Sequence, residues 1–218
     1  MSSRKYTSDK KAPSIFLYDE EIRREHSLIA GLDEAGRGPL AGPVVAAAVI
    51  LPEGTVIEGL RDSKKVAEKE RNKLFWEVVR KALSVGVGIV GADIIDRINI
   101  LQSTKRAMKE AVEDLGMTPD ILLIDAVRLP DIDIEQRPII KGESISASIA
   151  AASIIAKVVR DDIMCDYHET YPGYNFRGHK GYSTKEHMEL VNMLGPCPIH
   201  RMSFRKVRDE QAPIVYKH

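Results

Sequence analysis

The sequence lacks a long hydrophobic run. No apolar stretch among its 218 residues approaches the roughly 18 that a membrane-spanning helix needs, and VVAAAVIL at 44–51 has only the length of a strand. The first residues, MSSRKYTSDKKAPS, are polar and contain no apolar signal-peptide core. We therefore expect a globular protein with no membrane span and no secretory signal.

The sequence also has few cysteines and no net charge. The two cysteines, Cys165 and Cys197, do not indicate a disulfide framework, so we expect a reducing, cytoplasmic location. The 32 basic and 32 acidic residues cancel, so the charge of the whole chain does not point to nucleic acid. From Tyr171 onward there are eight Lys/Arg and four Asp/Glu, and on charge alone a solvated surface is the simpler interpretation of this basic end.

Two common nucleotide-binding fingerprints are missing. The glycines at 36, 38 and 42 give G-x-G-x3-G, which is not the dinucleotide spacing, and no G-x4-G-K-[ST] phosphate loop occurs. Internal repeats and low-complexity linkers are absent as well. On spacing alone, the glycine motif is therefore a weak signal for nucleotide binding.

Hydrophobic periodicity predicts strands and helices that alternate after an opening antiparallel hairpin. We expect strands at 28–33, 43–51, 85–92, 120–125 and 137–143. We expect helices at 18–26, 67–83, 99–116, from 144 onward and at 183–194. This order is typical of an α/β fold in which a mixed sheet is flanked by helices.

Acidic residues end three of the predicted strands, as Asp33 with Glu34, as Asp125 and as Glu143. In open α/β sheets, ligands bind in the crevice beyond the strand ends. Carboxylate oxygens suit Mg²⁺ or Mn²⁺, and a pair of such ions can activate water for phosphoryl displacement. Each acid alone is more simply explained as a turn residue or a helix cap, but three converging strand ends favour a metal site.

Seven blocks, spread in order over residues 28–207, resemble ribonuclease HII. They are AGLDEAGRGPLAGPVVAAAVIL, DSKK, LLID, IIKGES with SIAAASIIAKVVRD, YPGY, HKGYST and GPCPIHRMSF. The resemblance implies an RNase H-like mixed five-stranded sheet with a C-terminal helical region. It implies an endonuclease that hydrolyses the RNA strand of RNA–DNA hybrids and cuts at single ribonucleotides embedded in duplex DNA.

The resemblance also implies roles for individual residues. The catalytic and metal-binding acids would be Asp33, Glu34, Asp125 and Glu143, with Mn²⁺ or Mg²⁺ as cofactor and two ions when substrate is bound. The substrate-binding residues would be Gly36, Arg37 and Gly38 at the ribose 2′-hydroxyl, Lys64 and Lys65 at phosphates, and Tyr182 stacked on the deoxyribose that follows the ribonucleotide. At Glu143 the chain reads KGE where the family pattern resembles KGD.

The resemblance divides the chain into three parts. An N-terminal arm and short helix would cover 1–27, an RNase H-like catalytic core 28–168, and a basic helical region packed on the core 169–218. The expected partners are RNA–DNA hybrid and ribonucleotide-containing duplex DNA, with no membrane contact and a monomeric chain.

Several other interpretations stay open at this stage. Asp161, beside Asp162, competes with Glu143 as the fourth carboxylate, but a continuous helix from 144 would place it about 25 Å from the helix start. The pairs Cys165-x2-His168 and Cys197-x2-His200 are alternative zinc ligands, although about thirty residues separate them. Tyr182 is also consistent with an ordinary half-buried aromatic, and Arg37 with a brace for the turn. As functions, a non-catalytic binding module and a resolvase-like nuclease remain.

Overall fold

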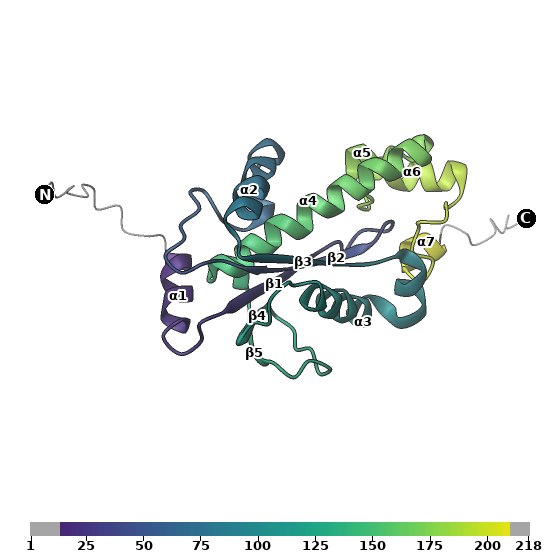
Figure 1. Ribbon diagram of the computed structural model, residues 1–218. Helices are drawn as coiled ribbons and strands as arrows, with labels where there is room; N and C mark the ends of the chain where they lie inside the picture. Colours follow the sequence, from purple (N-terminus) through teal and green to yellow (C-terminus); the bar gives the residue numbers. More distant parts are fainter. Residues whose placement is uncertain (1–13, 210–218) are drawn as a thin grey trace, which may run out of the picture.

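The computed structural model describes residues 14–209, and a five-stranded mixed sheet forms its centre (Figure 1). The strands are β1 (Ile29–Ala35), β2 (Val44–Ile50), β3 (Ser84–Val90), β4 (Ile121–Asp125) and β5 (Glu135–Ile139). Their spatial order is β3-β2-β1-β4-β5, with β1–β2 and β2–β3 antiparallel and β1–β4 and β4–β5 parallel. The predicted opening hairpin and mixed sheet are thus confirmed, while residues 1–13 of the predicted arm and 210–218 of the basic end lie outside the described range.

Helices cover both faces of the sheet. On one face, α1 (Ser14–Ile22) and α2 (Glu68–Lys81) pack with the long helix α4 (Ala147–Thr170), and α3 (Ala92–Glu113) covers the other (Figure 1). All seven residues of β2 are buried, with Ala47 and Val49 facing the α2–α4 layer and Ala46 and Ala48 facing α3. Since successive side chains of a strand point to opposite faces, a strand between two helix layers is apolar throughout.

The shorter elements complete the chain. Beyond the C-terminal half of α4 lie α5 (Phe176–His179), α6 (Lys185–Leu194) and α7 (Arg205–Asp209), which form the expected C-terminal helical region (Figure 1). Three single-turn 3₁₀ helices are η1 (Ser63–Lys65), η2 (Gly142–Ser144) and η3 (Pro172–Tyr174). Within the described range, every helix is too short or too polar to cross a bilayer.

Two helix boundaries differ from the prediction. The first helix covers 14–22 rather than 18–26, because Ile15, Phe16 and Ile22 are buried against the core. α3 begins at Ala92, seven residues earlier than predicted, and is interrupted at Asn99, where φ is 68°. The Asn99 side chain accepts hydrogen bonds from the amides of Leu101 and Gln102, so the predicted start at 99 is the cap of the second helical segment.

The predicted fifth strand is also misplaced. β5 ends at Ile139 instead of 143, and Lys141 then takes a left-handed conformation with φ of 58° that turns the chain away from the sheet. Gly142 donates its amide hydrogen to Asp125 Oδ1 at 2.9 Å. The prediction that Glu143 ends a strand is therefore wrong, since Glu143 lies in η2 and is brought beside β4 by this hydrogen bond.

Helix α4 lies unusually close to the sheet at Gly31 of β1. A Cβ atom at Gly31 would stand 2.1 Å from the carbonyl carbon of Ser148 and 2.2 Å from the amide nitrogen of Ile149. The helix backbone thus occupies the space of a side chain, and only glycine permits this contact. The contact fixes the first turn of α4 against Gly31, which lies two residues before Asp33 in β1.

We predict that Gly31→Ala lowers the free energy of unfolding by about 3 kcal/mol, because neither backbone can move without disturbing the sheet. Urea denaturation followed by circular dichroism measures this change. The matched control is Gly116→Ala, whose added Cβ would meet only the Ser84 hydroxyl, at 3.8 Å. A Gly31→Ala protein as stable as this control would contradict the proposed close contact.

Candidate active site

The parallel pairing of β1 with β4 brings two acids level with one another. Leu32 pairs with Ile124, so the next residues, Asp33 and Asp125, are neighbours at the ends of the two strands. Leu32 and Ile124 both pack toward α3, and the alternation of side chains therefore directs both carboxylates to the α4 face. Asp33 is only 5% exposed, so its charge is held in a largely dry position.

Burial and neighbouring acids raise the pKa values of two carboxyl groups, Asp33 and Glu34, at this end of the sheet. Burial, followed by repulsion from Glu34 and Asp125, raises the pKa of Asp33 well above its ordinary value. Burial also raises the pKa of Glu34, although its ion pair with Arg37 at 3.3 Å opposes the shift. Crowded carboxylates with raised pKa values are a frequent property of functional sites.

Glu34 and Glu143 each keep one buried carboxylate oxygen, Oε2, without a hydrogen-bond partner. Among residues 14–209, no three acidic, histidine or cysteine side chains are already closed around a point where an ion could sit. Asp33 is close enough to Glu34 and Asp125 to be repelled by them, but the carboxylate oxygens do not converge on a single point. Unpaired buried carboxylate oxygens are suitable ligands for a divalent cation such as Mg²⁺ or Mn²⁺.

Lys64 is a second cation, besides Arg37, that interacts with these acids. Partial burial acts to lower its pKa, but attraction to Asp33, Asp62 and Glu143, among others, raises the pKa overall. Asp62 caps η1 by accepting the amide hydrogen of Lys64 at 3.0 Å, which holds this short turn in place. Lys65 is exposed and lies 3.7 Å from Asp62.

The glycine-containing loop that follows β1, residues 36–43, lies beside the segment that carries Tyr182. Leu40 donates its amide hydrogen to the Gly181 carbonyl at 2.8 Å, which joins the two segments. Gly36 has φ of 100°, whereas Gly38 is exposed and a Cβ there would meet no atom within 4 Å. The Tyr182 side chain is 41% exposed, so its ring is accessible to a ligand.

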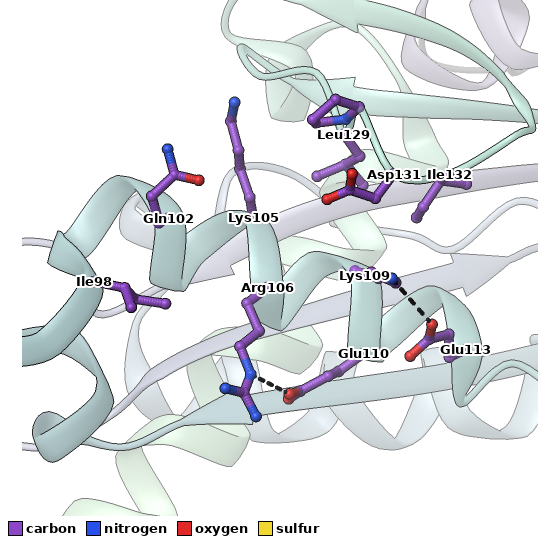
Figure 2. A pocket seen from close by; sticks show the side chains of 11 residues that line it. Ile98, Gln102, Lys105, Arg106, Lys109, Glu110, Glu113, Leu129, Asp131 and Ile132 are labelled. Carbon is purple, nitrogen blue, oxygen red and sulfur yellow. Dashed lines mark hydrogen bonds and ion pairs between the residues drawn. The ribbon is translucent and has the colours of Figure 1, made fainter.

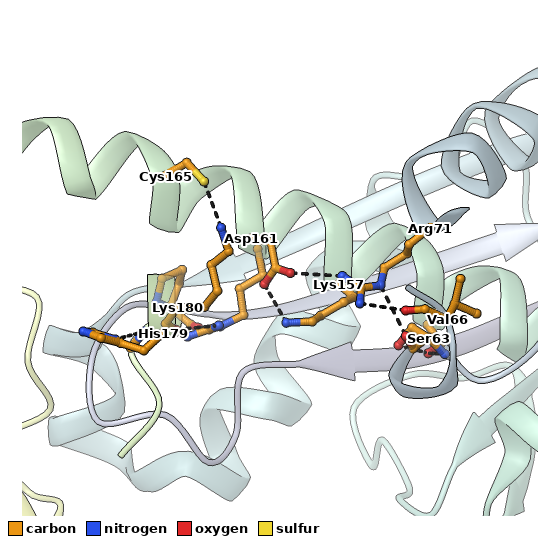
Figure 3. A network of polar contacts seen from close by, with 12 residues as sticks. Ser63, Val66, Arg71, Lys157, Asp161, Cys165, His179 and Lys180 are labelled. Carbon is orange, nitrogen blue, oxygen red and sulfur yellow. Dashed lines mark hydrogen bonds and ion pairs between the residues drawn. The ribbon is translucent and has the colours of Figure 1, made fainter. Parts of the chain in front are cut away.

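Asp161 does not join the acidic cluster. It lies on the unbroken helix α4, about 20 Å along the axis from the first turn, and forms ion pairs with Arg71 at 3.2 Å and Lys157 at 2.6 Å (Figure 3). Arg71 in turn donates to the carbonyls of Ser63 and Val66. The Asp161 carboxylate therefore anchors the η1 segment to α4, as expected for a structural charge.

The two Cys-x2-His pairs take part in separate contacts. Cys165 accepts a hydrogen bond from Lys180 Nζ at 3.0 Å, as Figure 3 shows. Cys197 lies 3.2 Å from His200 Nδ1, and the other ring nitrogen of His200 faces His187 at 3.1 Å. In the described structure Cys197 and His200 belong to a buried cluster of rings, whereas Cys165 contacts Lys180, and the two pairs do not form a single zinc site.

A cavity of about 590 Å³ lies elsewhere, between α3 and the loop that connects β4 with β5 (Figure 2). Its charged lining is largely paired internally, since Arg106 contacts Glu110 and Lys109 contacts Glu113. None of the ten residues that the sequence singles out lines this cavity. This cavity is therefore not part of the candidate site.

Sequence analysis misses two residues that contact the glycine-containing loop. Arg160 and Arg201 are both fully buried and donate to its backbone carbonyls. Both lie within the blocks that resemble ribonuclease HII, but the sequence does not indicate their role, because their backbone acceptors can belong to any residue type.

We predict that Asp161→Asn lowers the free energy of unfolding by about 1–3 kcal/mol and leaves catalysis close to that of the wild type. The reason is that Arg71 and Lys157 lose a largely buried partner, while the acids of β1 and β4 are untouched. Urea denaturation and a steady-state activity assay of the same preparation measure the two effects. A folded but inactive Asp161→Asn protein would show that Asp161 belongs to the active site.

Comparison with known proteins identifies the family. The family model for ribonuclease HII matches residues 30–207. A ribonuclease HII of Acetivibrio thermocellus is 59% identical over 191 residues, which are 87% of this chain and 75% of that protein. The crystal structure of the ribonuclease H2 from Pyrococcus horikoshii OT3 superposes with a TM-score of 0.69 at 25% identity, covering 84% of this chain and 96% of that one.

A more distant structure supports the fold alone. The crystal structure of Bst-RNase HIII in complex with Mn²⁺ has a TM-score of 0.63 at 18% identity and covers 95% of this chain and 76% of that one. The order of the strands, the C-terminal helical region and the sequence similarity all indicate the same family. The chain therefore belongs to the ribonuclease HII family and is a ribonuclease H enzyme.

Proposed function

We propose that this enzyme is a divalent-metal-dependent endonuclease that cuts the RNA strand of RNA–DNA hybrids. It also cuts duplex DNA on the 5′ side of a single embedded ribonucleotide and leaves 3′-hydroxyl and 5′-phosphate ends. The observation that carries the proposal is that a crowded carboxylate cluster, an exposed glycine (Gly38) and an exposed tyrosine occur in neighbouring segments of one chain. Because one chain supplies every proposed residue, we propose that it acts as a monomer.

Asp33, Glu34, Asp125 and Glu143 would hold the metal, as Mn²⁺ or Mg²⁺, with two ions when substrate is bound. Their oxygen-only donor set suits these hard cations, and the unpaired buried oxygens of Glu34 and Glu143 support a cation here. When bound, such ions activate a water molecule and stabilise the leaving oxygen of a phosphodiester. Asp33 and Asp125 would fix the position of the site, with Glu34 and Glu143 completing it.

The selectivity for a ribonucleotide would come from the glycine-containing loop and Tyr182. The backbone of Gly36, Arg37 and Gly38 would contact the 2′-hydroxyl, and the open space at Gly38 supports such an approach. The Tyr182 ring would stack on the deoxyribose that follows, where a second 2′-hydroxyl would clash. Lys64 and Lys65, both exposed at η1, would contact backbone phosphates.

The rival functions lead to different cleavage patterns. The test uses end-labelled duplexes that contain one ribonucleotide, only DNA, or an RNA–DNA hybrid, each with Mn²⁺, with Mg²⁺ or with EDTA. We expect metal-dependent cuts in the first and third substrates, with 3′-hydroxyl and 5′-phosphate ends, and none in all-DNA. Binding without cleavage would support a binding module, and cleavage of branched all-DNA would support a resolvase-like nuclease.

We predict that Asp33→Asn abolishes cleavage and raises the melting temperature in EDTA. The fold raises the pKa of Asp33, so its favourable contribution to stability is present at low pH and is lost as pH rises through the folded-state pKa. Asparagine removes the buried charge and keeps the oxygen that accepts the Glu34 amide hydrogen at 2.7 Å.

Differential scanning calorimetry with and without Mn²⁺ measures these effects. Mn²⁺ is expected to raise the melting temperature of the wild type more than that of Asp33→Asn, since an ion stabilises the state that binds it. Equal shifts in the two proteins would argue that Asp33 is not a metal ligand, whatever the variant's activity.

We predict that Glu143→Gln strongly reduces cleavage, because it removes the charge of a carboxylate that has one unpaired buried oxygen. We also expect Mn²⁺ to support at least as much activity as Mg²⁺, since Mg²⁺ demands nearly ideal octahedral geometry and Glu143 is one methylene longer than aspartate. Metal titrations of wild type, Glu143→Gln and Asp161→Asn measure both effects. An active Glu143→Gln beside an inactive, folded Asp161→Asn would reverse the assignment.

We predict that Tyr182→Ala lowers kcat/KM more on a single embedded ribonucleotide than on a long RNA–DNA hybrid, because only the former requires a junction between RNA and DNA. Gly38→Ala should lower both values similarly, since its new methyl group would meet the ligand and not the protein. Steady-state kinetics on both substrates provide the comparison. Equal losses in Tyr182→Ala would indicate a structural role for the ring.

A further inference from the structure

Two fully buried arginines lie beneath the glycine-containing loop, and neither is within ion-pair distance of a carboxylate in the part of the chain that the structure describes. Arg160 of α4 and Arg201, which precedes α7, are both 0% exposed. Within residues 14–209 neither forms an ion pair, and their guanidinium hydrogen bonds go to backbone carbonyl groups. Burying a charge costs free energy unless the charge is hydrogen-bonded. The hydrogen bonds of both arginines offset this cost and fix the backbone of the glycine-containing loop.

Arg201 holds the near end of the loop. Its guanidinium donates to the carbonyls of Gly36 at 2.6 Å, Arg37 at 3.1 Å, Pro39 at 2.8 Å and Gly42 at 3.0 Å. A trans peptide places its carbonyl and the following N–H on opposite sides. Because the first two carbonyls point inward to Arg201, the amide hydrogens of Arg37 and Gly38 point outward, and neither has a protein acceptor in the described structure.

Arg160 joins the far end of the loop to the tyrosine segment. It donates to the carbonyls of Pro43 at 3.0 Å and Ala41 at 3.2 Å, and also to that of Lys180 at 3.1 Å. Its guanidinium carbon lies 5.6 Å from the centre of the Tyr182 ring. A Cβ at Gly36 would stand 2.2 Å from Arg160 Nε, so the glycine at 36 leaves room for this side chain.

Backbone hydrogen bonds tie these parts into one unit. The Arg201 amide donates to the Leu40 carbonyl at 2.8 Å, and the Leu40 amide donates to the Gly181 carbonyl at 2.8 Å. The Gly42 amide donates to the Ile199 carbonyl at 2.9 Å. Three segments distant in sequence therefore share one rigid frame, with the two guanidinium groups at its centre.

We propose that Arg160 and Arg201 are positioning residues that set the distance and orientation between the outward amides of Arg37 and Gly38 and the ring of Tyr182. Arg201 presents the amides to the ribose, and Arg160 keeps Tyr182 one sugar further along the strand. This inference rests on the proposed function, because it concerns the same selectivity for a ribonucleotide followed by a deoxyribonucleotide.

The contacts require arginine and not only a positive charge. A guanidinium offers five donors in a rigid planar fork, whereas a lysine ammonium has three donors on a flexible stem and cannot span four carbonyls. Burial, followed by repulsion from Arg160, lowers the pKa of Arg201 to about 9, so the group stays charged at neutral pH. Lysine substitutions remove this geometry, and burial would also lower the pKa of a lysine at either position and weaken its charge.

The experiment compares Arg160→Lys and Arg201→Lys with the wild type on two substrates, a DNA duplex with one ribonucleotide and a long RNA–DNA hybrid. Arg160→Lys should lower kcat/KM on the first substrate about tenfold more than on the second. The reason is that the substitution displaces Tyr182, whose ring would contact the junction between RNA and DNA. Arg201→Lys should raise KM on both substrates by similar factors. The control is Arg23→Lys, a largely buried arginine that donates to the Leu51 carbonyl away from this unit.

The ratio between substrates separates positioning from a general loss of stability, which would lower both activities together. An unchanged ratio in a folded Arg160→Lys protein, or an unchanged KM in Arg201→Lys, overturns the proposal. If Arg160→Lys lacks the wild-type circular dichroism spectrum, Arg160→Gln is measured in its place. The ratio of kcat/KM between the two substrates is then the deciding quantity. A wild type that does not cut at a single ribonucleotide would refute the proposed function instead, so the two failures are distinguishable.

Discussion

The direct contact between α4 and β1 is the constraint on which both parts of the proposed site depend. At Gly31 the helix backbone lies against the strand, two residues before Asp33. The same unbroken helix, about 36 Å long, carries Arg160 to the glycine-containing loop and Met164 into apolar contact with Tyr174 and Phe176 of the C-terminal helical region. One rigid element therefore relates the carboxylates to the segment that carries Tyr182, and a shift at its first turn would move both.

Much of the sheet and part of the site could be predicted from the sequence, because they depend on local patterns. The all-apolar β2 and the acids that follow apolar strands are visible as such, and parallel pairing then places Asp33 beside Asp125. The position of Glu143 could not be predicted in this way. It depends on a left-handed Lys141 and on one hydrogen bond from Gly142, and neither has a periodic signal.

The buried arginines show a second limit of sequence analysis. Asp161 could be excluded from the acidic cluster by the length of a helix alone, since its distance from the first turn follows from the rise per residue. Arg160 and Arg201 offered no comparable argument, because the carbonyls that they bind lie 119 and 165 residues away in the chain, at Ala41 and Gly36. Contacts from a side chain to a distant backbone become visible only in three dimensions.

The parallel pairing of β1 with β4 also bears on how the chain folds. β1 and β2 form a hairpin of neighbouring segments, whereas Asp33 and Asp125 are separated by 92 residues and meet only when a long loop closes. A chain that has formed only the hairpin carries two distant acids with little mutual repulsion. The electrostatic repulsion within the carboxylate cluster can therefore arise only when this long loop has closed, and a chain that has formed only the hairpin lacks the pairing of Asp33 with Asp125.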